Sequence, residues 1–199
     1  MAFWIIACSI GEAVGIALVA TVYAALDRGL LASAWVWILL AGTWEGLWLG
    51  GAQALVLRRF AIQPARWIGF TVLGAVLGYG LSLLGGAGQQ GEAAASEPGT
   101  LLMLALGAGL GIIMGTLMGA LQWLAARGQL VPGYWVAANA AGWAPAMAII
   151  IWAAGAVPEE TSLPVIALAG AAAGTAAGCL VGGATAPVLP RREGTGIAD

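Results

Sequence analysis

Two acidic side chains are the strongest candidates for chemistry in this sequence. Glu12 and Glu45 each lie inside a long apolar run, and neither run contains a lysine or arginine that would pair with them. Counted from Trp4 and Leu57 at the ends of these runs, their heights in two neighbouring helices differ by only about 6 Å at 1.5 Å per residue. In a membrane, exposing such a charge to hydrocarbon costs at least about 2.5 to 3.5 kcal/mol. We therefore expect Glu12 and Glu45 to be buried neighbours.

Two roles are open for this pair. Burial and mutual repulsion favour the protonated forms, so the two carboxyl groups could share a proton or bind a cation. Alternatively, Glu12 and Glu45 are neutral acids that hydrogen-bond to backbone carbonyls and only pack the helices.

Six further polar residues predict a layer across the helices. Three of them follow a tryptophan by four residues, and the other three lie at a similar height on the returning helices. The layer consists of Cys8, Thr71, Asn139, Gln53, Gln122 and Thr185. Hydrogen bonds between helices, typically worth about 0.6 to 2 kcal/mol each, are the favoured role. A ligand site is the alternative.

Composition sets the class of protein. Of the 199 residues, 61% are hydrophobic and 8% charged, and the mean hydropathy is +0.95. A soluble domain of this size would lack the polar surface to cover its core, so the sequence predicts an integral membrane protein. There is no histidine, and Cys8 and Cys179 lack C-x-x-C spacing. We expect no metal, no cofactor and no enzymatic activity, and the net charge of −2 argues against a nucleic-acid partner.

Six apolar runs each reach the roughly 20 residues that a membrane-spanning helix needs. They cover residues 3–26, 34–57, 67–86, 101–125, 134–155 and 163–187. The predicted fold class is an all-α integral membrane protein with six transmembrane helices in a single membrane domain, 1–199. Arginines follow the second, fourth and sixth runs, so the positive-inside rule places both termini and a short tail, 193–199, in the cytoplasm.

Glycine recurs every fourth residue in the second, fourth and sixth runs, which predicts close glycine-zipper packing of these helices. The nine positions are Gly42, Gly46, Gly50, Gly111, Gly115, Gly119, Gly174, Gly178 and Gly182. Aligning the runs on these glycines predicts three αα-hairpins, about 3–57, 64–125 and 132–187. All three run in the same direction, so we expect parallel repeats in a pseudo-threefold arrangement about the membrane normal.

Aromatic and basic residues at the cytoplasmic ends of the runs predict anchoring in the lipid bilayer. A tryptophan opens each odd-numbered run, as in an aromatic belt, and an arginine that can reach the headgroups follows each even-numbered run. The expected interfacial anchors are Trp4, Trp67, Trp135, Arg58, Arg127 and Arg191. Anchoring is favoured over substrate recognition for all six.

Two segments resemble a known group of proteins. They read G-G-A-Q-A-L-V-L-R-R followed by P-A-R-W, and G-A-L-Q-W-L-A-A-R followed by P-G-Y-W. Both are similar to small bacterial multi-pass membrane proteins with glycine-rich helices and G-x-x-Q-W-L-x-L-R / P-x-x-W hairpin repeats. The third hairpin departs from this pattern, with Thr185 for glutamine and Pro187 for the aromatic residue. The resemblance implies the bacterial inner membrane as location and no catalytic or binding residue.

These features favour a non-catalytic scaffold or accessory subunit whose outer faces bind lipid, pigment or other membrane-protein subunits. The alternative is a small proton- or cation-coupled carrier or channel that uses Glu12 and Glu45. A water-accessible cavity that reaches this pair would favour the carrier, and a filled interior would favour the scaffold.

Overall fold

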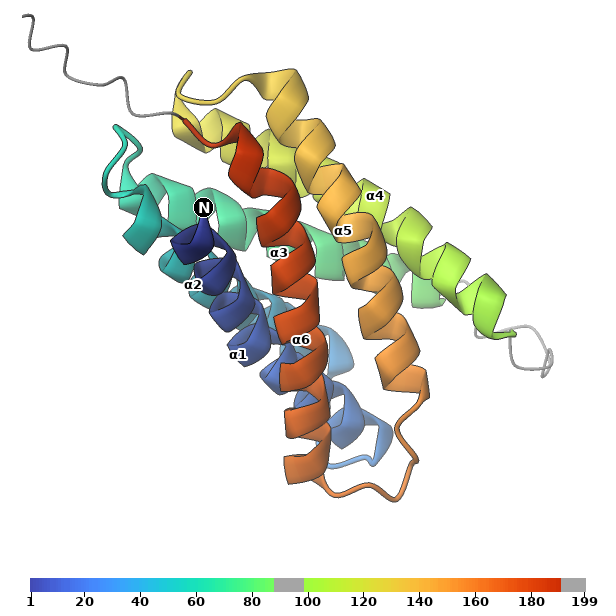
Figure 1. Cartoon of the computed structure of the whole chain (residues 1–199). Helices are drawn as coiled ribbons and strands as arrows, with labels where there is room; N and C mark the ends of the chain where they lie inside the picture. Colours follow the sequence, from blue (N-terminus) through green and yellow to red (C-terminus); the bar gives the residue numbers. More distant parts are fainter. Residues whose placement is uncertain (88–98, 191–199) are drawn as a thin grey trace, which may run out of the picture.

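The computed structural model describes residues 1–87 and 99–190, where the chain forms six long helices and one short 3-10 turn (Figure 1). The elements are α1 (Ala2–Asp27), α2 (Ala34–Leu57), α3 (Pro64–Ala87), α4 (Thr100–Ala126), α5 (Pro132–Gly155), α6 (Leu163–Thr185) and η1 (Ala186–Val188). The all-helical prediction is confirmed, and each apolar run coincides with one helix to within a turn.

Five of the six helices are long and apolar enough to cross a membrane. We expected six, and α2 is the helix that falls short. Its 24 residues give sufficient length, but four tryptophans, Glu45 and Gln53 lower its mean hydropathy. This departure from the expectation therefore comes from the polar and aromatic residues that make α2 a candidate for function.

The helices form a closed ring. Each helix packs against its neighbours in the sequence, and α6 returns to pack along α1. Contact is most extensive between α4 and α5 and between α1 and α6, and least extensive between α3 and α4. The N-terminus, the α2–α3 and α4–α5 turns and the end of α6 lie at one end, and the α1–α2 and α5–α6 turns lie at the other (Figure 1).

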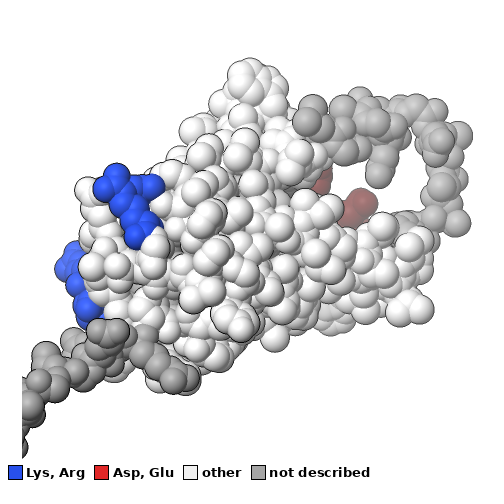
Figure 2. All heavy atoms as spheres, turned by 90° about the horizontal axis from the view of Figure 1, so that it is seen from above, with Lys and Arg blue, Asp and Glu red and all other residues white. Residues whose placement is uncertain are grey.

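Charged side chains distinguish the two ends, as Figure 2 shows. The arginine end carries Arg58 and Arg59 in the turn after α2, Arg66 in the first turn of α3 and Arg127 in the turn after α4. The acidic end carries Asp27 at the end of α1 and Glu159 and Glu160 in the turn after α5, together with Arg28, whose guanidinium group donates to the carbonyl oxygens of Glu159 and Thr161. The expected anchors Arg58 and Arg127 are exposed, whereas Arg191 and the tail 193–199 lie outside the described residues.

The spaced glycines lie where two helices meet backbone to backbone. A Cβ atom at Gly115 of α4 would lie 2.5 Å from the Asn139 carbonyl oxygen of α5, and one at Gly178 of α6 would lie 2.5 Å from that of Cys8 in α1. On α2, a Cβ at Gly46 would lie 2.6 Å from Cα of Val72 in α3. The other glycines of each row meet the same neighbouring helix. Each row thus joins its helix to the next one around the ring, rather than to its partner in the predicted hairpin.

Three tryptophans lie inside the protein, contrary to the expectation that they face the headgroups. Trp4, Trp67 and Trp135 are 0 to 1% exposed, and their ring centroids are 5.8 to 6.4 Å apart in edge-to-face contacts. They point inward because each lies on the same helix face as a buried polar residue four positions later, such as Thr71 after Trp67. An aromatic belt therefore does not account for these tryptophans. Their three rings pack together inside the protein at the arginine end, and we call them the tryptophan cluster.

Candidate functional site: a central cavity ending at a carboxyl pair

A cavity of about 740 Å³ lies between the helices in the half of the protein toward the acidic end. Every one of the six helices contributes to its lining. Its walls are mainly apolar, with side chains such as Ile16, Val19, Met114 and Ile150. Residues of the turns after α1 and α5 also line it, so its mouth lies at the acidic end.

Glu45 of α2 and Tyr79 of α3 meet at the inner part of this cavity. The Tyr79 hydroxyl donates a hydrogen bond to Oε2 of Glu45, and both side chains line the cavity. Glu45 is only 4% exposed. The tyrosine ring reaches this position because it lies over Gly42, where a Cβ would be 2.5 Å from Cδ2 of the ring. Gly42 therefore makes room for the side chain that holds the carboxylate.

Glu12 of α1 lies beside this pair but is closed off from the cavity. It is 0% exposed, and within residues 1–87 and 99–190 neither of its carboxylate oxygens has a hydrogen-bond partner. Glu45 packs against the same helix, because its Cγ would be 2.6 Å from a Cβ at Gly15. Glu45 therefore packs against α1 within one turn of Glu12.

The chemistry of this arrangement follows from its donors and acceptors. Among the described residues, the Tyr79 hydroxyl donates a hydrogen bond to Glu45, whereas Glu12 accepts none. A buried carboxylate needs a proton, a cation or a donor, because burying an unpaired charge is costly. A proton shared by the pair, or a cation beside it, would satisfy the oxygens of Glu12.

The polar layer lies between this site and the arginine end. Trp67 Nε1 and Gln122 Nε2 both donate to Oε1 of Gln53, at 3.0 and 3.1 Å. Gln122 Nε2 also lies 3.3 Å from the Thr71 hydroxyl, and Gln53 Nε2 lies 3.4 Å from the Cys8 sulfur. These contacts join four helices, which is the interhelical role that the sequence favours for the layer.

Thr185 and Asn139, the remaining members of the layer, also form hydrogen bonds, but two buried polar atoms nearby have no hydrogen-bond partner. Trp4 Nε1 donates to the Thr185 hydroxyl at 2.8 Å, and Asn139 Nδ2 donates to the Trp135 carbonyl at 3.0 Å. Trp135 Nε1 and Oε1 of Gln122 are buried and without a partner among the described residues. Together with the tryptophan cluster, the layer fills the interior between the cavity and the arginine end with buried side chains.

Sequence reasoning missed the residues that shape the cavity around Glu45. Tyr79 is the most important of them, and Tyr23 and Ser82 also line the space. A signal was present: Tyr79 follows Trp67 by twelve residues, which puts it roughly 18 Å above the tryptophan cluster at 1.5 Å per residue. Counting back from Gln53 puts Glu45 at nearly the same height.

The chain matches no protein-family model, no curated protein and no solved structure. The resemblance to glycine-rich bacterial membrane proteins therefore stays a prediction.

Proposed function

We propose that the protein is a small membrane carrier that binds its solute in the central cavity and uses Glu45 and Glu12 as a proton or cation site. One observation carries the proposal. The cavity reaches the Glu45 carboxyl group, which Tyr79 holds, and the adjacent helix α1 carries Glu12, a buried carboxyl group without any partner among the described residues. Intramembrane acidic residues that face a cavity are typical of proton and ion pathways.

The lining indicates the class of solute. A volume of about 740 Å³ lies within the range of sites for small organic molecules, and such sites combine apolar walls with a few fixed polar groups. Here the polar groups in the inner part of the cavity are the Glu45 carboxyl and the Tyr79 hydroxyl, whereas Asp27, Arg28 and Glu159 line its mouth. A largely apolar molecule with a basic group fits this combination, because its cation would neutralise the buried carboxylate.

A carrier must also close and reopen, and the layout of the helices supports such a cycle. The polar layer and the tryptophan cluster block the arginine end while the acidic end is open. We propose that the three glycine rows mark three parallel repeats around a pseudo-threefold axis, whose relative motion would alternate access to the site. By the positive-inside rule, both termini and the arginine end would lie in the cytoplasm of a bacterium, with the cavity open to the outside.

The scaffold hypothesis, which the sequence favours, remains the alternative. It expects an interior filled by side chains along its whole length. The interior is filled in this way at the arginine end only, and the cavity occupies the other half. That difference supports the carrier, while partners on the outer faces stay a prediction.

The proposal is tested with tetraphenylphosphonium, an apolar organic cation. Saturable binding to the protein in lipid nanodiscs is measured by equilibrium dialysis, with empty nanodiscs as blank. We expect Glu45→Gln to weaken binding roughly tenfold or more, because interactions with a charged partner are worth about 1.5 to 3 kcal/mol. The matched control is Glu160→Gln, which removes an exposed carboxylate that does not line the cavity and should leave binding unchanged.

Transport is then measured in proteoliposomes that are acidic inside. Wild type should take up the cation faster than protein-free liposomes do as protons leave, and Glu45→Gln and Glu12→Gln should not exceed that protein-free rate. If wild type binds the cation saturably but no gradient drives uptake, the protein is a receptor or scaffold with a ligand site. If binding to Glu45→Gln equals that of wild type, the proposal is wrong.

A further inference from the structure

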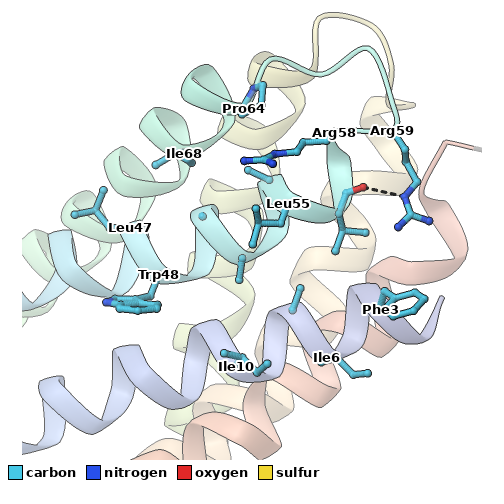
Figure 3. Close-up of a pocket in the computed structure, with 15 residues that line it drawn as sticks. Phe3, Ile6, Ile10, Leu47, Trp48, Leu55, Arg58, Arg59, Pro64 and Ile68 are labelled. Carbon is cyan, nitrogen blue, oxygen red and sulfur yellow. Dashed lines mark hydrogen bonds between the residues drawn. The ribbon is translucent and has the colours of Figure 1, made fainter.

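A second cavity opens on the outer surface, between α1 and α2 at the arginine end (Figure 3). Its volume is about 780 Å³, and we call it the α1–α2 groove. Gly51 and Ala52 of α2 line the groove, and because they have little or no side chain, they leave space between the two helices. Its two walls carry large apolar side chains, namely Phe3, Ile6 and Ile10 of α1 and Leu47, Trp48 and Leu55 of α2.

Two arginine side chains lie near one end of this groove, with the guanidinium group of Arg58 on the Pro64 side and that of Arg59 on the Phe3 side (Figure 3). Arg58 and Arg59 follow the last residue of α2, and both are exposed and line the groove. Arg59 Nε donates a hydrogen bond to the Val56 carbonyl oxygen at 3.1 Å, which holds the Arg59 side chain against the end of α2 (Figure 3). In the part of the chain that the structure describes, neither arginine forms an ion pair with an acidic side chain. The exposed acidic residues Asp27 and Glu159 lie at the opposite end of the protein.

The dimensions match one leaflet of a bilayer. Eleven residues separate Leu47 from Arg58, which corresponds to roughly 16 Å along the helix at 1.5 Å per residue. Half of a typical hydrocarbon core is about 15 Å. An acyl chain laid along the groove from a headgroup at the arginines would therefore end near Leu47.

We propose that the α1–α2 groove binds an anionic phospholipid, with its anionic headgroup between Arg58 and Arg59 and one acyl chain between α1 and α2. Charge complementarity selects this occupant. Guanidinium groups bind phosphate oxygens in a bidentate manner, and basic residues at the cytoplasmic ends of transmembrane helices are typical contacts of anionic headgroups. A transmembrane helix of another protein would fill the apolar part but would leave two cations without a counter-charge. The proposal does not depend on the carrier function.

Trp48 reports directly on the groove, because it lines the wall and is 42% exposed. The protein is reconstituted in zwitterionic phosphatidylcholine with a small fraction of phosphatidylglycerol that carries brominated acyl chains, which quench nearby tryptophan. A second sample contains the same fraction of brominated phosphatidylcholine. The Trp48 signal is the difference between wild type and Trp48→Phe.

We expect stronger quenching of Trp48 by brominated phosphatidylglycerol than by brominated phosphatidylcholine. The excess should disappear when Arg58 and Arg59 are both replaced by glutamine, and it should persist in Arg127→Gln, the matched control in the other turn of the arginine end. In wild type, high salt should also reduce the excess, because screening weakens contacts between exposed charges. This salt measurement tests the proposal even if the double variant does not fold.

Three outcomes would overturn the proposal. Equal quenching by the two lipids would show that the groove does not select the headgroup. An excess that survives both the double substitution and high salt would show that the arginines do not bind it. No quenching by either lipid would show that protein covers the groove, and cross-linking would then identify a second copy or a partner.

Discussion

Replacing Gly115 with alanine tests whether close approach of α4 and α5 holds the helices together. The added methyl group would lie 2.5 Å from the Asn139 carbonyl oxygen and 2.7 Å from Cα of Ala140. Ordinary contacts between carbon atoms are about 3.5 to 4.0 Å, so the two backbones must move apart by roughly 1 Å. On the same helix, a Cβ at Gly109 would meet nothing within 4 Å. Gly109→Ala is therefore the matched control.

The magnitude follows from comparing these two variants. Each gains the helix propensity of alanine over glycine, up to about 1 kcal/mol. Only Gly115→Ala also forces extra atoms into a packed contact, which typically costs about 1 to 3 kcal/mol. A shift of roughly 1 Å would also weaken the contacts at Gly111 and Gly119, since a gap of 0.5 to 1 Å forfeits about a quarter to a half of the dispersion energy. We expect the free energy of unfolding of Gly115→Ala to be about 1 to 3 kcal/mol below that of Gly109→Ala.

Equilibrium unfolding in mixed micelles, titrated with sodium dodecyl sulfate and followed by circular dichroism, measures this difference. Tryptophan fluorescence should give the same transition, which checks that unfolding is two-state. If both variants have the same stability, or if Gly115→Ala is the more stable, glycine does not hold α4 against α5. The packing argument would then be wrong.

Three more predictions concern the interior, the cavity and the orientation. Gln53→Leu removes the acceptor of Trp67 Nε1, and an unsatisfied buried donor should lower the free energy of unfolding by about 1 to 3 kcal/mol in the same titration. In a cysteine-free background, Ala20→Cys in the cavity should react with a water-soluble thiosulfonate, and Leu18→Cys on the outer surface of the same helix should not. Gly128→Cys in the α4–α5 turn should react with a membrane-impermeant maleimide only after cell lysis.

Each of these predictions has an outcome that contradicts it. Unchanged stability of Gln53→Leu would mean that the polar layer is not a clasp between helices. Equal reactivity of the two α1 cysteines would mean that the cavity holds no water. Labelling of Gly128→Cys in intact cells would place the arginine end outside and the mouth of the cavity in the cytoplasm.

The sequence predicts the helices and the depth of their polar residues well, because both depend on position along a single helix. Residue counts place Glu12 and Glu45 at similar heights on neighbouring helices, and Glu45 packs against α1 within one turn of Glu12. The contacts among Gln53, Gln122 and Thr71 follow from the same counting. A rise of 1.5 Å per residue suffices for such estimates.

The missed features depend on rotation about the helix axis and on the choice of neighbour. Trp67 is at the predicted height, but its side chain points inward with Thr71 rather than outward to lipid. Gly46 marks a close helix contact in the sequence, yet its spacing does not tell whether α1 or α3 makes that contact. Tyr79 reaches Glu45 only because Gly42 on the facing helix has no side chain. That dependence joins two residues 37 positions apart, and no local pattern reveals it.

The contact of α6 with α1 has a consequence for biogenesis. The ribosome delivers α1 first and α6 last, yet the two helices share one of the most extensive interfaces of the ring. The backbone of α1 around Cys8 and Glu12, which Gly178 and Gly174 cover in the folded protein, stays uncovered until α6 has been made. A nascent chain that stops before α6 leaves this surface uncovered, next to an intramembrane carboxyl group. Closure of the ring by α6 is thus the step that buries this surface of α1.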